Sequence, residues 1–103
     1  MVNCWIFAGD VPIGQAALAI RDRSMGVLGG AFHPTADYQA VRPQIQATSW
    51  DLPSQMLLIA RTETGEQLDP VAGIFIEDAP EIDVCEVTVV GVDSAIIRRY
   101  FGD

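Results

Sequence analysis

The stretch Ser24–Pro34, SMGVLGGAFHP, decides how this chain folds, because it joins a strand-rich beginning to the first predicted helix. It contains three of the nine glycines and the only histidine. Glycine tolerates positive φ angles and close backbone approach, so three glycines within five positions indicate unusual backbone geometry. We expect a third strand with a bulge at Gly29-Gly30, followed by a helix that begins after His33 with Pro34 in its first turn.

Residues 4–20, which precede this stretch, predict a β-hairpin. Residues 4–8 are short, apolar and partly aromatic, which is typical of a strand. Gly9–Pro12 supplies turn residues, and residues 13–20 then predict the returning strand.

Helical spacing follows the glycine-rich stretch, with Tyr38, Val41 and Ile45 on one stripe. Pro43 removes a helical hydrogen bond and disfavours α geometry at the residue before it. Two alternatives remain open: a helix that ends just before Pro43 with a second turn restarting there, or one kinked helix through about Ala47.

The second half of the chain predicts three more strands and a final helix. A loop is expected at residues 50–53 and a kink or a bulge at Asp69-Pro70. Asp93 is placed to cap the final helix, and Gly102 is placed to end it. The three strands are expected in the apolar, β-branched stretches 56–60, 71–76 and 82–92.

This order of elements predicts a single α+β domain over residues 1–103. We expect a mainly antiparallel sheet of five or six strands, with two short helices packed on one face. No apolar run approaches the roughly 20 residues of a membrane helix. The first residues lack the positive charge and long apolar region of a signal peptide. We therefore expect a cytoplasmic protein without membrane contact.

The two cysteines, Cys4 and Cys85, stand 81 positions apart without CxxC spacing, and a single histidine accompanies them. That pattern predicts no zinc site, and no other metal or cofactor is expected. Two buried, reduced thiols in neighbouring strands are the expected arrangement, with a disulfide or a reactive thiol as the alternatives.

The charge is concentrated in the second half of the chain. Residues 1–50 balance three acidic residues with three arginines, whereas residues 51–103 carry eleven acidic residues and three arginines, which gives the net charge of −8. There is no lysine. A negative field of this kind repels the phosphates of nucleic acids and attracts cationic surfaces. Nucleic acid is therefore not an expected partner, and a basic protein is.

The densest acidic cluster is the candidate protein-binding surface. Without the regular loop pattern of a calcium site, the cluster does not predict a metal site, and a solvated acidic face is the simplest alternative. The predicted function is a small acidic protein-interaction module of the immunity, antitoxin or inhibitor type, or one that self-associates as a homodimer. The candidate residues are Glu77, Asp78, Glu81, Asp83 and Glu86.

The alternative function is a small-molecule-binding or enzymatic domain centred on Gly26–Tyr38. Its glycines would cradle an anion ahead of a helix, and its histidine would act as a general acid or base. The spacing matches neither GxGxxG nor a phosphate loop, and no nucleophile is evident, so no catalytic residue is predicted. The candidate ligand-binding residues are Gly29, Gly30, His33 and Tyr38.

The segment Met25-Gly26-Val27-Leu28-Gly29-Gly30-Ala31-Phe32-His33-Pro34-Thr35, with Tyr38 after it, resembles a family of small bacterial proteins that has no assigned function. The resemblance covers about residues 1–50. It implies no activity and assigns no role to any residue.

Overall fold

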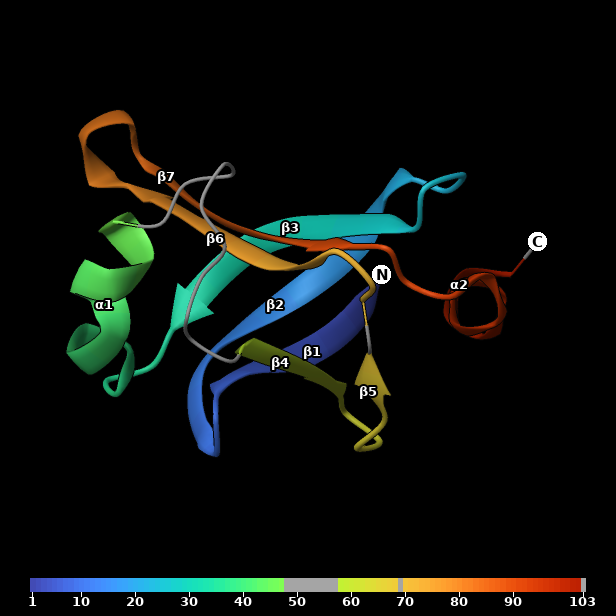
Figure 1. The fold of residues 1–103 in the computed structure, drawn as a ribbon, viewed down its shortest axis with the longest axis horizontal. Helices are drawn as coiled ribbons and strands as arrows, with labels where there is room; N and C mark the ends of the chain where they lie inside the picture. Colours follow the sequence, from blue (N-terminus) through green and yellow to red (C-terminus); the bar gives the residue numbers. More distant parts are fainter. Residues whose placement is uncertain (48–57, 69, 103) are drawn as a thin grey trace.

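Seven strands and two α-helices make up residues 1–47, 58–68 and 70–102, the part of the chain that this computed structural model describes (Figure 1). In chain order the elements are β1 (Val2–Ala8), β2 (Val11–Asp22), β3 (Val27–Pro34), α1 (Tyr38–Ala47), β4 (Leu58–Thr62), β5 (Gln67–Leu68), β6 (Gly73–Ala79), the short 3-10 helix η1 (Pro80–Ile82), β7 (Val84–Val90) and α2 (Ser94–Phe101).

The strands form one antiparallel sheet in the order β5-β4-β1-β2-β3-β7-β6. Its two edge strands, β5 and β6, follow each other directly in the chain. Because the sheet must curl to bring its edges together, β4 and β6 come into contact although four strands lie between them (Figure 1). The sheet therefore has an inner face and an outer face.

Every second side chain along a strand points to the inner face, where the core lies. In β1, Val2, Cys4 and Ile6 are buried, whereas Asn3 and Trp5 between them are exposed, as the two-residue period of a strand requires. The helices lie at opposite ends of the long axis (Figure 1). Both complete the same core, α1 with Tyr38 and Ile45 and α2 with Ile97.

The structure confirms the α+β class, the antiparallel sheet and the two short helices, and it corrects the number of strands. Within the described residues the sheet has seven strands rather than five or six, because the short β5 also pairs with β4. The helices approach the sheet from opposite ends of the long axis, and both bury side chains in the core on its inner face.

The glycine-rich stretch also differs from the prediction. β3 runs without a bulge through Gly29 and Gly30, and its backbone pairs with β7 at both glycines. A Cβ atom at Gly30 would lie 2.1 Å from the carbonyl oxygen of Ala17, so this glycine is needed for a close backbone approach. Pro34 ends the strand instead of starting the helix, and α1 begins at Tyr38.

Other boundaries agree more closely. The hairpin predicted at residues 4–20 is formed by β1 and β2. Of the two alternatives for the first helix, the continuous one is observed, because α1 passes through Pro43 to Ala47. The predicted loop at 50–53, the first two residues of the strand at 56–60 and Asp69 of the predicted kink lie outside the described residues.

The two cysteines are free thiols, as expected, but they are not in neighbouring strands. Cys4 lies in β1 and Cys85 in β7, and β2 and β3 separate them. Cys4 is buried, and Cys85 is half-buried. The spacing along the sequence gave no information on strand order, which is set by the long-range pairing of β3 with β7.

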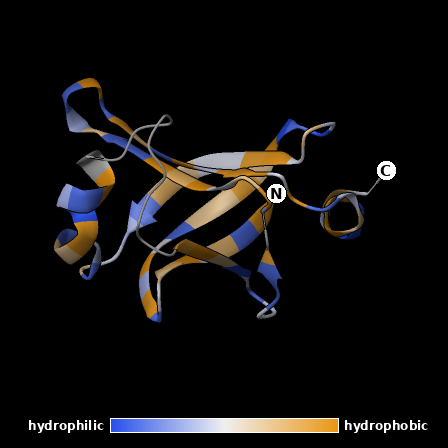
Figure 2. Cartoon of the chain, in the orientation of Figure 1, coloured by the Kyte–Doolittle hydropathy of each residue, from blue (hydrophilic) through white to orange (hydrophobic). Residues whose placement is uncertain are grey.

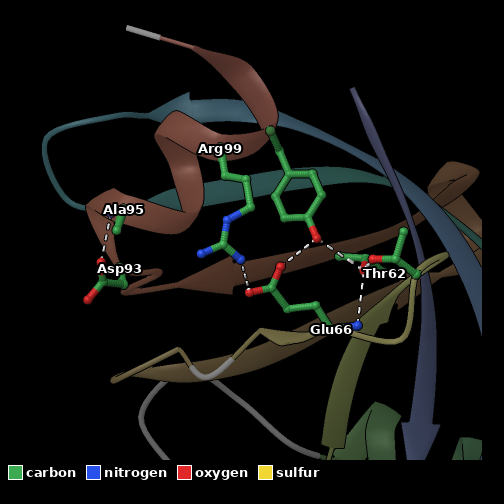
Figure 3. Close-up of polar contacts among 7 residues, drawn as sticks. Thr62, Glu66, Asp93, Ala95 and Arg99 are labelled. Carbon is green, nitrogen blue, oxygen red and sulfur yellow. Dashed lines mark hydrogen bonds and ion pairs between the residues drawn. The ribbon is translucent and has the colours of Figure 1, made fainter.

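Polar contacts dock α2 against the turn between β4 and β5 (Figure 3). The Tyr100 hydroxyl donates to Glu66 Oε1 at 2.6 Å, and Arg99 forms an ion pair with the same carboxylate. These two contacts lower the pKa of Glu66. The expected cap is also present, since the carboxylate of Asp93 accepts a hydrogen bond of 2.7 Å from the backbone N–H of Ala95.

We predict that Gly30→Ala destabilises the protein by about 3 kcal/mol or more, because the added methyl group collides with immobile backbone. Gly29→Ala is the matched control. Its Cβ atom would meet mainly the flexible side chain of Arg21, at 3.1 Å. Urea unfolding should therefore give a clearly larger loss for Gly30→Ala, and equal losses would contradict the close approach of β2 and β3.

We also predict that Tyr100→Phe raises the pKa of Glu66, because the bond that contributes most to lowering it is lost. Since the pKa is depressed in the folded state, the contribution of Glu66 to stability is present above its unfolded pKa and is lost as the pH falls through its folded pKa. Titration of the Glu66 carboxyl carbon by NMR measures the change. Arg98→Gln is the control, because the described contacts of Glu66 do not include Arg98. An unchanged Glu66 titration in Tyr100→Phe would contradict this docking geometry.

Candidate functional site

The acidic cluster lies on the hairpin formed by β6, η1 and β7. Glu77 and Asp78 are near the end of β6, Glu81 is in η1, Asp83 follows η1, and Glu86 is in β7. Four of these side chains are exposed, whereas that of Asp78 is only 6% exposed. The predicted cluster is therefore divided between the surface and the interior.

Asp78 connects the hairpin to α1. Its Oδ2 atom accepts hydrogen bonds from the Tyr38 hydroxyl at 2.8 Å and from Arg42 Nε at 2.9 Å. Burial and the bond to Asp78 raise the pKa of Tyr38, so its hydroxyl remains a donor. The Arg42 side chain is 34% exposed, so one side of this ion pair still faces water. Asp78 is occupied by these contacts and acts as a brace that fixes the hairpin on the helix.

Two of the exposed acidic residues flank an exposed apolar side chain in the sequence. Ile82 is 65% exposed and lies between Glu81 and Asp83 in sequence. Asp83 has a left-handed backbone with φ of 55°, a conformation that aspartate tolerates better than most residues. Glu77 and Glu86 stand directly opposite each other across the strands. Hydrophilic and hydrophobic residues accordingly alternate at the end of the hairpin (Figure 2).

Sequence reasoning missed Ile82. Its β-branched side chain was expected to begin the strand at 82–92, but the strand begins at Val84 because η1 occupies residues 80–82. The only available signal was an isoleucine with an acidic residue on each side.

The candidate ligand-binding residues do not converge. Gly29 and Gly30 are buried inside β3, and so they form no loop ahead of a helix. His33 is exposed on the outer face, whereas Tyr38 is buried with its ring 5.2 Å from that of Phe32. His33 and Tyr38 therefore belong to different faces of the sheet.

His33 instead lies beside a hollow on the outer face of the sheet. Gln15 pairs with both Trp5 and His33, so these three side chains form a row across β1, β2 and β3. The hollow has a volume of about 350 Å³. Its lining residues are Asn3, Cys4, Trp5, Gln15, Ala16, Ala17, His33 and Glu63.

The sequence analysis did not identify Trp5, Gln15 or Glu63 as site residues. Part of this arrangement follows from local structure, because the hairpin turn at Gly9-Asp10 brings Trp5 opposite Gln15. Glu63 follows Thr62, which pairs with Cys4 over a distance of 58 residues, and local sequence does not specify that pairing.

Neither cysteine is activated. Burial, with a smaller effect of Glu63, raises the pKa of Cys4 to about 11. Burial and then the charge of Asp78 raise the pKa of Cys85. Reactive cysteines have a lowered pKa instead, so the surroundings of both cysteines disfavour the reactive thiolate.

Across residues 1–47, 58–68 and 70–102, no group of three His, Cys, Asp or Glu side chains is arranged to hold a metal ion. Within the same residues, neither helix is long and apolar enough to cross a membrane.

We predict that Asp78→Ala lowers the free energy of unfolding by about 2 kcal/mol, because it leaves the Tyr38 hydroxyl without its carboxylate and removes the ion pair with Arg42. Glu77→Ala, one residue away and exposed, should change it by less than about 0.5 kcal/mol. Chemical denaturation of the two variants makes the comparison. Equal effects would show that Asp78 is an ordinary surface carboxylate.

Comparisons with protein-family models, with curated proteins and with solved structures find no significant match to this chain. The candidate functional residues are therefore identified by their geometry and charge alone.

Proposed function

We propose that this protein is a small binding module that takes a basic protein partner on the tip of its β6–β7 hairpin. The tip is defined by Glu81, Ile82 and Asp83, with Glu77 and Glu86 behind it. The observation that carries the proposal is the exposure of Ile82 between two carboxylates. A central apolar anchor with a polar rim is the usual anatomy of a protein–protein hot spot.

The charges of the tip specify the kind of partner. Like charges directly opposite each other on neighbouring strands are unfavourable, and Glu77 and Glu86 are such a pair. A cationic surface would relieve this repulsion and would also be attracted over a long range. The partner would therefore present an apolar pocket for Ile82 within a ring of arginine or lysine side chains.

The brace at Asp78 supports the same function. A binding segment that is already fixed loses little conformational entropy when the partner arrives. The contacts from Tyr38 and Arg42 fix the hairpin on α1 just behind the tip (Figure 1). The module is therefore expected to bind as a nearly rigid surface.

Self-association through this tip is disfavoured. Two copies meeting tip to tip would bring their carboxylates together without cations to neutralise them. We therefore place the homodimer second to a basic partner of different sequence.

The test uses the partner that co-purifies with the protein from its native cell and is identified by mass spectrometry. We predict that Ile82→Ala weakens its dissociation constant by about ten- to a hundredfold, since a buried hot-spot side chain contributes about 1.4–3 kcal/mol. Glu81→Gln/Asp83→Asn should weaken binding too, mainly by slowing association, and should reduce its dependence on salt up to about 0.5 M.

The control is Glu63→Gln, which removes a carboxylate remote from the tip. It should leave the affinity for this partner close to that of the wild type. A partner that binds with the same affinity at all salt concentrations, and is indifferent to the substitutions at the tip, would contradict the proposed function.

A further inference from the structure

The hollow on the outer face of the sheet is a second site, separate from the hairpin tip. It lies over β1, β2 and β3 and is bounded by Glu63 in the turn after β4. Its volume of about 350 Å³ is within the range of small-ligand pockets, at the lower end. It has a floor of small residues, since Ala17 pairs with Asn3 beside the row of larger side chains.

The polar side chains around the hollow are available for a ligand. Among the described residues, the side chains of Asn3, Gln15, His33 and Glu63 make no hydrogen bond or ion pair with one another or with a neighbour. Asn3, Gln15, His33 and Glu63 are all exposed. Trp5 is 37% exposed, so part of its indole ring also faces solvent.

The charge of the hollow selects a cation. Glu63 is its one acidic lining residue, and Arg61 is the nearest basic residue along β4. Arg61 stands opposite Trp5 across the strands, with its guanidinium over the ring of Phe7, 5.4 Å from the centroid. Among the described residues, no ion pair joins Glu63 to Arg61 or to His33.

The chemical groups of the lining favour a planar cation over a compact one. A guanidinium group stacks on an aromatic ring and offers five N–H donors in one plane, whereas an ammonium group is a strongly hydrated point charge. Trp5 offers the ring, Glu63 offers the carboxylate, and the side-chain oxygens of Asn3 and Gln15 are further acceptors. A phosphate or carboxylate ligand would be repelled by Glu63 and by the net charge of −8.

We propose that this hollow binds an alkylguanidinium group, which stacks on Trp5 and pairs with Glu63. The alkyl chain lies over the small residue Ala17, and the side-chain amide oxygens of Asn3 and Gln15 accept hydrogen bonds from the remaining N–H groups. The group is carried either by a small molecule or by an exposed arginine side chain of a peptide.

Butylguanidinium, butylammonium and neutral butylurea are the probes that test the proposal. The readout is the shift of the Trp5 indole N–H signal in a nitrogen–proton NMR spectrum, with Trp50→Phe used to assign the two indole signals. We predict saturable binding of butylguanidinium, weaker binding of butylammonium and no binding of butylurea. The titrations extend to about 20 mM, because millimolar dissociation constants are expected for so small a ligand. Equal binding of the neutral and cationic probes, or no saturation by butylguanidinium, would overturn the proposal.

Two variants that each remove one negative charge show which carboxylate binds the guanidinium group. Glu63→Gln should weaken the binding of butylguanidinium at least tenfold, whereas Glu81→Gln, at the hairpin tip, should leave it unchanged. Equal effects would reduce the binding to a general response to net charge and would overturn the site. The macromolecular partner of the tip should respond in the opposite way, so either proposal can fail while the other stands.

A peptide with one arginine between glycines distinguishes the two sources. Tighter binding of this peptide than of butylguanidinium would identify an arginine side chain as the occupant, and weaker binding would identify a small molecule. Either result supports the guanidinium site if Glu63→Gln abolishes the difference in affinity between the peptide and butylguanidinium.

Discussion

The structure depends on the close approach of two backbones at the centre of its sheet. Gly30 of β3 lies so near the carbonyl oxygen of Ala17 in β2 that only a hydrogen atom fits in place of a side chain. A glycine inside a strand commonly marks such an approach or a tight bend. β2 and β3 are central strands, and β1 and β7 are paired to their free sides. The inward and outward placement of the other side chains is therefore set by this pair of strands.

Local signals in the sequence were sufficient for local structure. The turn residues Gly9–Pro12 and the strand-like stretches on either side predicted the β1–β2 hairpin, and Asp93 predicted the start of α2 by its capping chemistry. Pro34 and the glycine pair were misleading, because each is compatible with two structures. Proline suits the first turn of a helix and also the end of a strand, and glycine suits a bulge and also a close approach.

The candidate sites depend on contacts that sequence patterns do not specify. Tyr38 and Asp78 are 40 residues apart, and their hydrogen bond removes one carboxylate from a cluster of five that looked uniform in the sequence. Trp5, Gln15 and His33 form a row only because three strands pair in one register. The composition did predict the sign of the charge, and both proposed sites use it. The fold separates the carboxylates by role. Asp78 is bound within the structure, whereas those of the hairpin tip and Glu63 beside the hollow are exposed in different surroundings.

The order of the strands has a consequence for how the protein is made. β1, β2 and β3 are joined by short turns and are synthesised first, but each outer strand of this meander waits for a distant partner. Cys4 pairs with Thr62, and Gly30 pairs with Val87. Until those residues leave the ribosome, both sides of the nascent meander expose unpaired backbone groups, which are templates for pairing with other chains. The topology thus makes the newborn chain, rather than the finished protein, the form most in need of protection from aggregation.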